Sequence, residues 1–256
     1  MSKIYKALAR AEAERGNHAP EPEAKVQSSS VLNPEPEPHR GEDAHLEVPE
    51  HREEYEKLKV MLTLEAARSE LKSVMLVSAL GGEGVSTVTL GLAAAMADVA
   101  RQGVLVMDLN ASHPVLPERL ALHPTVGLGE LLAKDATRAE AIVESPIHHL
   151  FVLGRGRASA DLSQPSSLAL FEELLRGLRS DFDHLIIDGG SLATSPDCLL
   201  VASKVDGVIL VVQAERTGSD TVREASNQLR MAGGNLLGAV LNRRREYLPS
   251  FLARKL

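Results

Sequence analysis

The sequence predicts an α/β fold in which a doubly wound, mostly parallel sheet carries helices on both faces. Short apolar runs alternate with helical stretches along most of the 256-residue chain, which is the pattern of repeated βα units. Hydrophobic residues make up 44% of the chain and aromatic residues only 3%. Nearly continuous aliphatic strands of this kind are typical of parallel sheets that are buried on both faces.

The first 50 residues differ in composition from the rest, and we predict three parts in the chain. Residues 1–16 form a short amphipathic helix, with Ser2 as its N-cap and Gly16 just past its end. This helix docks either on the chain's own domain or on a partner protein, and the sequence favours neither. Residues 17–50 are rich in Pro, Glu and Ser, so we expect a disordered, extended linker. Residues 51–256 then form the folded domain and a basic C-terminal tail.

The folded domain is expected to begin with a helix and then to alternate strands with helices. Apolar periodicity predicts helices at 52–67, 86–100, 168–178 and 218–231, and a loop and helix up to about residue 134. Strands are predicted at the apolar runs 74–78, 104–108, 150–153, 184–188, 208–212 and 236–242. Asp108 and Asp188 each close one of these strands. Ligands of such sheets bind at this carboxyl edge, so both side chains are site candidates.

Composition excludes several classes of function. The net charge of −7 argues against nucleic-acid binding, which needs a surplus of Lys and Arg. The single cysteine, Cys198, excludes an intrachain disulfide and a Cys-based zinc site, and we interpret it as a packed interior residue. No apolar run approaches the roughly 18 residues of a spanning helix. We therefore expect a cytoplasmic protein without a transmembrane segment of its own, which associates with the inner face of the cell membrane only peripherally.

A glycine-rich loop follows the first predicted strand and leads directly into a helix. Residues 79–87 read ALGGEGVST. At such a junction the backbone N–H groups and the helix dipole converge on one point, which makes an anion site suited to phosphate. An ordinary glycine-rich turn is the alternative, but the strand, the helix and the later Asp-ending strands all favour a P-loop. The predicted nucleotide-binding residues are Gly81, Gly82, Glu83, Gly84, Val85, Ser86 and Thr87, with Ser86 also holding Mg²⁺.

The loop departs from the full P-loop pattern at two positions. Ala79 replaces the first glycine, and Val85 stands where the pattern has a lysine. That lysine places a positive charge between the β- and γ-phosphates, and losing such a stabiliser typically costs about 10²–10³ in rate. Arg155, Arg157 or an arginine of a partner are candidates to supply the missing charge, and no sequence feature chooses among them.

Asp108 and Asp188 are the predicted metal-binding partners of this loop. Strand-end carboxylates commonly support Mg²⁺, directly or through water. The alternative is that both residues only begin turns and cap helices. The neighbouring phosphate loop favours the metal role, so the sequence predicts a site for ATP or ADP with Mg²⁺ held by Ser86, Asp108 and Asp188.

Residues 53–242 resemble the cytoplasmic domain of bacterial tyrosine kinases of capsule and exopolysaccharide biosynthesis, the CpsD/CapB-like family. The shared pieces are GGEGVST, VLVMDLNASHP, GLGELL, DFDHLIIDGG, VDGVILVV and LLGAVLN, in the family's order. The first residues, MSKIYKALARAEAERG, and the last, LNRRREYLPSFLARKL, are also similar to those of the family. The resemblance therefore covers nearly the whole chain except the linker.

The resemblance implies an activity and partners. Members of the family bind ATP and Mg²⁺ between the subunits of a ring and autophosphorylate tyrosines of a C-terminal tail. They work with a membrane chain-length regulator, or co-polymerase, of polysaccharide export. By position, Asp108 and Asp188 would be the catalytic residues, with Asp108 as the base for a tyrosine hydroxyl. Asn242 would lie beside the adenine, and Tyr247 is the candidate phosphoacceptor.

The chain departs from the family at positions that carry the kinase chemistry. Val85 replaces the P-loop lysine, Asn110 a second acidic residue and Ser112 an arginine. In the E-x-x-R-x-x-R oligomerisation helix, Glu56 stands at the first arginine. The tail offers the single tyrosine Tyr247 rather than a cluster.

Three functions follow, in order of preference. The first is a regulator of exopolysaccharide polymerisation and export whose tyrosine-kinase site is degenerate or weak. The second is an active autokinase that uses a compensating cation and Tyr247, Tyr5 or Tyr55 as its acceptor. The third is a positioning ATPase of the MinD/ParA type. We disfavour the third because two lysines of that group are missing, at Leu80 and at Val85.

Overall fold

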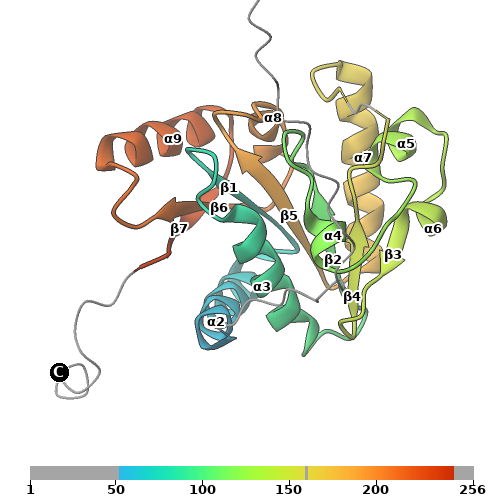
Figure 1. Ribbon diagram of the computed structural model, residues 1–256, viewed down its shortest axis with the longest axis horizontal. Helices are drawn as coiled ribbons and strands as arrows, with labels where there is room; N and C mark the ends of the chain where they lie inside the picture. The colour runs from blue at the N-terminus through green and yellow to red at the C-terminus, as the bar shows by residue number, and fades with distance from the viewer. Residues whose placement is uncertain (1–51, 159–160, 245–256) are drawn as a thin grey trace, which may run out of the picture. The chain divides into compact units, whose positions relative to one another are not determined.

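The structure, a computed structural model, describes residues 52–158 and 161–244. The predicted N-terminal helix (1–16), the linker (17–50) and the tail with Tyr247 lie outside these residues. The described residues form one seven-stranded sheet with helices on both of its faces (Figure 1).

The sheet has the order β3-β4-β2-β5-β1-β6-β7. All neighbouring pairs are parallel except β3 and β4, which are antiparallel. This confirms the predicted doubly wound, mostly parallel sheet. The strands are β1 (Ser73–Ser78), β2 (Val104–Asp108), β3 (Ile142–Glu144), β4 (Leu150–Leu153), β5 (His184–Ser191), β6 (Gly207–Gln213) and β7 (Leu236–Asn242).

The helices agree with the prediction in place but not at every boundary. The helix predicted at 86–100 ends at Ala97, and the helix predicted from 168 begins at Pro165, whose fixed φ suits the first turn. No helix in the described part of the chain is long and apolar enough to cross a membrane. The helices are α2 (Arg52–Ser69), α3 (Val85–Ala97), α4 (Leu116–Arg119), α5 (Leu128–Ala133), α6 (Arg138–Ala141), α7 (Pro165–Asp181), α8 (Asp197–Ala202) and α9 (Ser219–Met231).

Two hydrophobic cores lie on the two faces of the sheet, because successive strand residues point to opposite sides. On one face, Leu76 and Ile186 pack with α2, α3 and α4. On the other, Met75 and Ile187 pack with α5, α7, α8 and α9. Cys198 is buried in the second core, which confirms its interpretation as a packed residue.

Helix α2 packs directly on α3, and the two helices approach each other closely at Gly91. A Cβ atom added at Gly91 of α3 would overlap the ring of Tyr55, which comes from α2. Glycine at this helix position therefore makes room for the tyrosine ring. The Tyr55 side chain is half-buried there, and burial raises the pKa of its hydroxyl.

Candidate functional site

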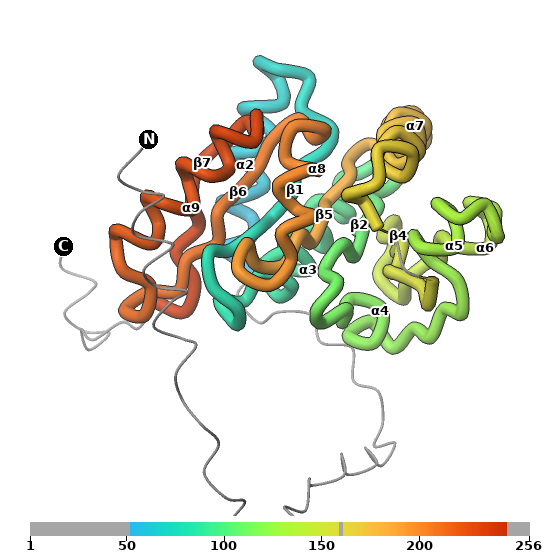
Figure 2. The backbone as a smooth tube through the Cα atoms, turned by 90° about the horizontal axis from the view of Figure 1, so that it is seen from above, coloured from blue at the N-terminus to red at the C-terminus, as the bar shows by residue number. Residues whose placement is uncertain are grey.

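The central strands β1, β2 and β5 lie side by side (Figure 2) and are parallel, so their carboxyl ends lie at the same edge of the sheet. Asp108 at the end of β2 is the register partner of Asp188 on β5, and Asp188 in turn pairs with Leu76 of β1. The glycine-rich loop leaves β1 just beyond this point and enters α3. The fold thus brings the loop and both aspartates together, as the sequence predicted.

The backbone of the loop has the conformation that its glycines allow. Gly82 and Gly84 have φ angles of +80° and +93°, which strain residues that carry a Cβ. Within α3 the backbone N–H of Val88 is bonded to the carbonyl of Gly84. The N–H groups that precede it in the first turn have no acceptor within the helix. These groups form the anion-binding end of α3.

Glu83 holds the loop through its side chain instead of presenting it to a ligand. Its carboxylate is fully buried and accepts hydrogen bonds from the N–H of Leu80 at 2.8 Å and of Gln213 at 3.0 Å. The hydroxyl of Thr217 also donates to it. Glu83 therefore fastens the loop to the end of β6, and only its backbone remains for the predicted phosphate contact.

Asn242 fixes the same loop from β7. Its Nδ2 atom donates to the carbonyl of Glu83 at 2.8 Å. A Cβ atom at Gly84 would overlap this amide, so the glycine is required for the close approach as well as for its φ angle. Asn242, predicted beside the adenine, lies against the loop backbone.

The two aspartates are buried, and each is only partly satisfied by backbone donors. Asp108 accepts from the N–H groups of Asn110 and Leu116, each at 3.1 Å. Asp188 accepts from the N–H of Gly190 at 2.9 Å through Oδ1, whereas its Oδ2 atom is buried without a hydrogen-bond partner. The hydroxyl of Ser86 lies close enough to lower the pKa of Asp188 but does not complete a hydrogen bond to Oδ2.

Burial dominates the electrostatics of this pair. Burial, and secondly the charge of Asp188, raises the pKa of Asp108 from 3.8 to about 7. Burial also raises the pKa of Asp188, against the opposing effects of Ser86, Gly190 and Arg119. Two neighbouring buried carboxylates, one with an orphaned oxygen, fit a divalent cation, because oxygen ligands suit Mg²⁺ and a buried charge needs a partner.

The position of the missing lysine contributes no charge. Val85, the first residue of α3, is buried in the core that this helix and α2 form with the sheet. Of the predicted replacements, Arg155 donates from Nη1 to the carbonyl of Leu109 at 3.0 Å, directly after Asp108. Arg157 is exposed, and its backbone N–H is held by Glu130.

Arg119 does contact the loop, and sequence reasoning missed it. Its Nη1 atom donates to Thr87 Oγ1 at 2.8 Å, and its charge lowers the pKa of Asp188. The residue ends the four-residue helix α4, which begins where the N–H of Leu116 is bonded to Asp108. No spacing rule links it to the loop, so the available signal was only a basic residue on the segment after Asp108.

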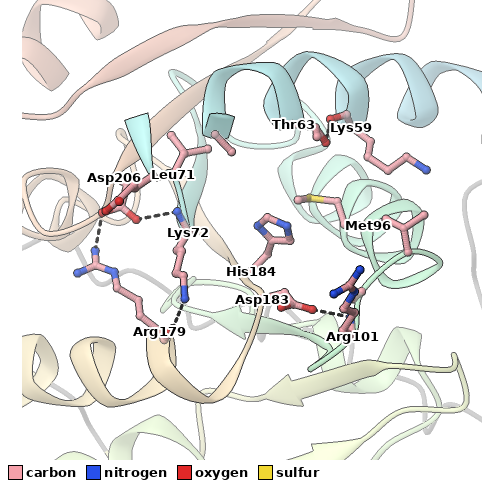
Figure 3. Close-up of a pocket in the computed structure, with 14 residues that line it drawn as sticks. Lys59, Thr63, Leu71, Lys72, Met96, Arg101, Arg179, Asp183, His184 and Asp206 are labelled. Carbon is pink, nitrogen blue, oxygen red and sulfur yellow. Dashed lines mark hydrogen bonds and ion pairs between the residues drawn. The ribbon is translucent and has the colours of Figure 1, made fainter. Parts of the chain in front are cut away.

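A cavity of about 780 Å³ lies elsewhere, at the opposite edge of the sheet (Figure 3). It is lined by the beginnings of β1 and β5 and by parts of α2, α3 and α7. Arg179 is paired there with Asp206, and Lys72 donates to the Arg179 carbonyl. Because it faces away from the glycine-rich loop, this cavity is not the predicted nucleotide site.

No protein-family model matches the chain, but curated proteins do. The tyrosine-protein kinase YwqD of Bacillus subtilis is 28% identical over 190 residues, which are 74% of this chain and 80% of YwqD. The tyrosine-protein kinase CpsD of Streptococcus agalactiae is 26% identical over 193 residues, 75% of this chain and 84% of CpsD. This chain is a homologue of the bacterial tyrosine kinases.

Another relative of this tyrosine-kinase homologue is much longer. The succinoglycan biosynthesis transport protein ExoP of Rhizobium meliloti is 29% identical over 180 residues, which are 69% of this chain but only 23% of ExoP. The matched region therefore forms a small part of that transport protein.

Solved structures with similar folds include the kinase domains of bacterial tyrosine kinases. The kinase domain of VpsO has a TM-score of 0.66 and 26% identity, with 76% of this chain and 96% of that domain covered. The kinase domain of the Escherichia coli tyrosine kinase Etk has a TM-score of 0.68 at 22% identity, covering 78% and 79%. MinD of Pyrococcus horikoshii, solved with Mg-ADP, scores 0.55 at 22% identity and covers 72% and 76%, so it shares the fold alone.

The homology to bacterial tyrosine kinases confirms the resemblance that the sequence motifs indicated. Val85 stands at the P-loop lysine position. Glu56 and Lys59, at the positions of the oligomerisation helix, form an ion pair with each other within α2. Val85 is therefore uncharged, and the charges of Glu56 and Lys59 are paired with each other.

Proposed function

We propose that the protein regulates exopolysaccharide or capsule polymerisation and export, as a nucleotide-binding homologue of the tyrosine kinases with a weak or degenerate kinase site. The observation that carries this proposal is Val85. Its side chain is buried in the core, where an active P-loop has a lysine, whereas the anion-binding turn and the buried acid pair are retained. A site built in this way keeps groups that bind phosphate and metal but lacks a principal stabiliser of phosphoryl transfer.

The proposed ligand is ATP or ADP with Mg²⁺. The backbone from Gly81 to Thr87 would hold the phosphates, and Ser86, Asp108 and Asp188 would hold the metal. The orphaned Oδ2 atom of Asp188 supports this assignment, because a buried carboxylate oxygen without a partner is costly. Mg²⁺ bound there would supply positive charge to the phosphate oxygens. The Mg-ADP complex of MinD, which has the same fold, is consistent with the proposal.

The proposed partner is a membrane chain-length regulator, or co-polymerase, of polysaccharide export. ExoP supports this idea, because the matched region accounts for only 23% of a transport protein for succinoglycan biosynthesis. By analogy, the matched region of this chain would act together with a membrane component of polysaccharide export. We accordingly place the protein in the cytoplasm, at the inner face of the membrane, where it acts as a peripheral protein and as a homo-oligomer.

An active tyrosine autokinase is the second candidate, and the state of Asp108 favours it. With a pKa of about 7, this carboxyl is suited to accept a proton near neutral pH. Tyr55 is a poor acceptor, because its ring is packed against Gly91. The acceptor would therefore be Tyr247 or Tyr5, which lie outside the described residues.

Two measurements on the purified full chain test the proposal. Calorimetry with ATP and Mg²⁺ should show binding, and phosphotyrosine analysis after incubation with ATP should show far less than one phosphate per chain. Stoichiometric phosphotyrosine that disappears in Asp108→Ala would instead establish the autokinase. Absence of any nucleotide binding would remove the nucleotide from the proposal. The polysaccharide role is tested separately, since deletion of the protein should change the chain length of the exported polymer.

A further inference from the structure

The position of Arg119 is fixed from both sides of the candidate site. Its helix, α4, starts where the N–H of Leu116 is bonded to Asp108 at 3.1 Å. Leu116 and Leu120 are both buried and hold this short helix against the core. The guanidinium then reaches Thr87 Oγ1 at 2.8 Å. One segment of chain thereby connects the metal-binding aspartate to the phosphate loop.

The charges around this contact are unbalanced without a positive group. Asp108 and Asp188 are both fully buried, and Val85 contributes nothing to offset them. Arg119 is only partly buried. The atom that Arg119 contacts belongs to the first turn of α3, whose N–H groups form the anion-binding end of the helix. Ser86, in this same first turn, and Arg119 both lower the pKa of Asp188, whose Oδ2 atom is buried without a hydrogen-bond partner.

We propose that Arg119 stands in for the missing P-loop lysine: its guanidinium supplies, from α4, the positive charge that binds the phosphates of a nucleotide seated on residues 81–87. This inference rests on the proposed nucleotide binding and deepens it. A guanidinium can hold Thr87 with one N–H and donate others to phosphate oxygens, since it has five donors in a planar fork. The charge thus enters the site from the strand-end loop of β2 rather than from the P-loop itself.

Two other arginines lie near enough to be compared with it. Arg155 donates to the carbonyl of Leu109. Arg216 donates to Gln213, and its Nη1 lies 3.5 Å from the position that a Cβ of Gly82 would take. Arg119 is favoured because it donates to the P-loop side chain of Thr87. Its charge also lowers the pKa of Asp188. A purely structural role, in which Arg119 only clamps α4 to α3, is the other explanation to be tested.

The experiment removes the positive charge at position 119 and places one at position 85, separately and together. ATP-Mg²⁺ and ADP-Mg²⁺ affinities are measured by calorimetry for the natural protein, Arg119→Gln, Val85→Lys and the double variant Arg119→Gln/Val85→Lys. We expect Arg119→Gln to weaken ATP binding at least about ten-fold, the effect of losing one charged hydrogen bond. A lysine at position 85 restores the positive charge but cannot repair a loosened α4. Since we propose that Arg119 acts through its charge, the double variant should recover most of the lost ATP affinity. Arg138→Gln is the matched control, because Arg138 pairs with Asp181 on α7. Thermal unfolding checks that each variant is folded.

Each outcome decides a different point. If the natural protein binds no nucleotide, this inference fails together with the nucleotide-binding part of the proposed function, and the polysaccharide role is left to its own test. If it binds and Arg119→Gln binds equally well, only the role of Arg119 is overturned. A loss that Val85→Lys does not rescue would make Arg119 a structural clamp. A larger loss in Arg155→Gln or Arg216→Gln than in Arg119→Gln would assign the charge to that arginine.

Discussion

Asp108 and Asp188 are register partners on the adjacent strands β2 and β5, and the Oδ2 atom of Asp188 is buried there without a hydrogen-bond partner. Two acids held so close in the interior oppose each other's ionisation. Ionising both buried carboxyls therefore lowers the stability of the folded protein, and a bound cation would reduce this loss. The first two predictions follow from this relationship.

The contribution of Asp108 to the stability of the metal-free protein should fall as pH rises from about 4 to above 7. The pKa of Asp108 is raised by burial from 3.8 to about 7, so the folded state binds a proton more tightly than the unfolded state. The stabilisation is full below the unfolded pKa and is lost as pH rises through the folded pKa. Chemical denaturation in a chelator, across this pH range, measures the slope.

Asp108→Asn isolates this effect. His184 has a pKa lowered by burial and contributes the opposite sign, so its stabilisation is lost as pH falls. The difference between the natural protein and Asp108→Asn cancels that contribution. Equal slopes in the two proteins would show that Asp108 is not the titrating group.

Mg²⁺ with ADP should raise the thermal midpoint of the natural protein but not that of Asp188→Asn. The substitution removes one of two opposed buried charges, so the metal-free variant should be more stable by about 1 kcal/mol. Asp220→Asn, on the exposed start of α9, is the control and should keep the response to Mg²⁺-ADP. Loss of stability in metal-free Asp188→Asn would contradict the assignment of a repulsive pair.

Glu83→Gln should loosen the P-loop without touching a phosphate-binding side chain. The buried carboxylate accepts from Leu80, Gln213 and Thr217, and an amide can accept through only one oxygen. We expect a loss of about 1–3 kcal/mol in unfolding free energy, with weaker ATP binding. Denaturant titration measures it, and Glu173→Gln, exposed on α7, should change neither quantity.

Gly91→Ala should destabilise the packing of α2 on α3. The added methyl group would overlap the Tyr55 ring, and overpacking of this kind costs about 1–3 kcal/mol. Gly238→Ala is the matched control, because a Cβ there meets no atom within 4 Å. In a double-mutant cycle, Tyr55→Ala should remove most of the penalty at position 91, and additive effects would argue against the contact.

Much of the fold was predictable because most of its strands are nearly continuous apolar runs, and two of these runs end at an aspartate. Asp108 and Asp188 identified the ligand edge for this reason, and the glycines identified the loop. The strand β3 was missed because it has three residues and pairs only at the sheet edge. The helices α6 and α8 are one or two turns long and give no clear period.

Side-chain roles inside the site were less accessible to sequence reasoning. Glu83 looked like part of a phosphate cradle, but its partners Gln213 and Thr217 lie about 130 positions away. Arg119 joins the loop only because α4 folds back from Asp108 onto α3. Such long-range contacts depend on tertiary packing and leave no periodic signal in the chain.

The bond from Asn242 to the carbonyl of Glu83 has a consequence for signalling. Asn242 is the last residue of β7, so the chain leaves the sheet at the P-loop itself, and the segment with Tyr247 follows directly. A ligand-induced shift of the Glu83 carbonyl would therefore reach the C-terminal end of β7 through this amide.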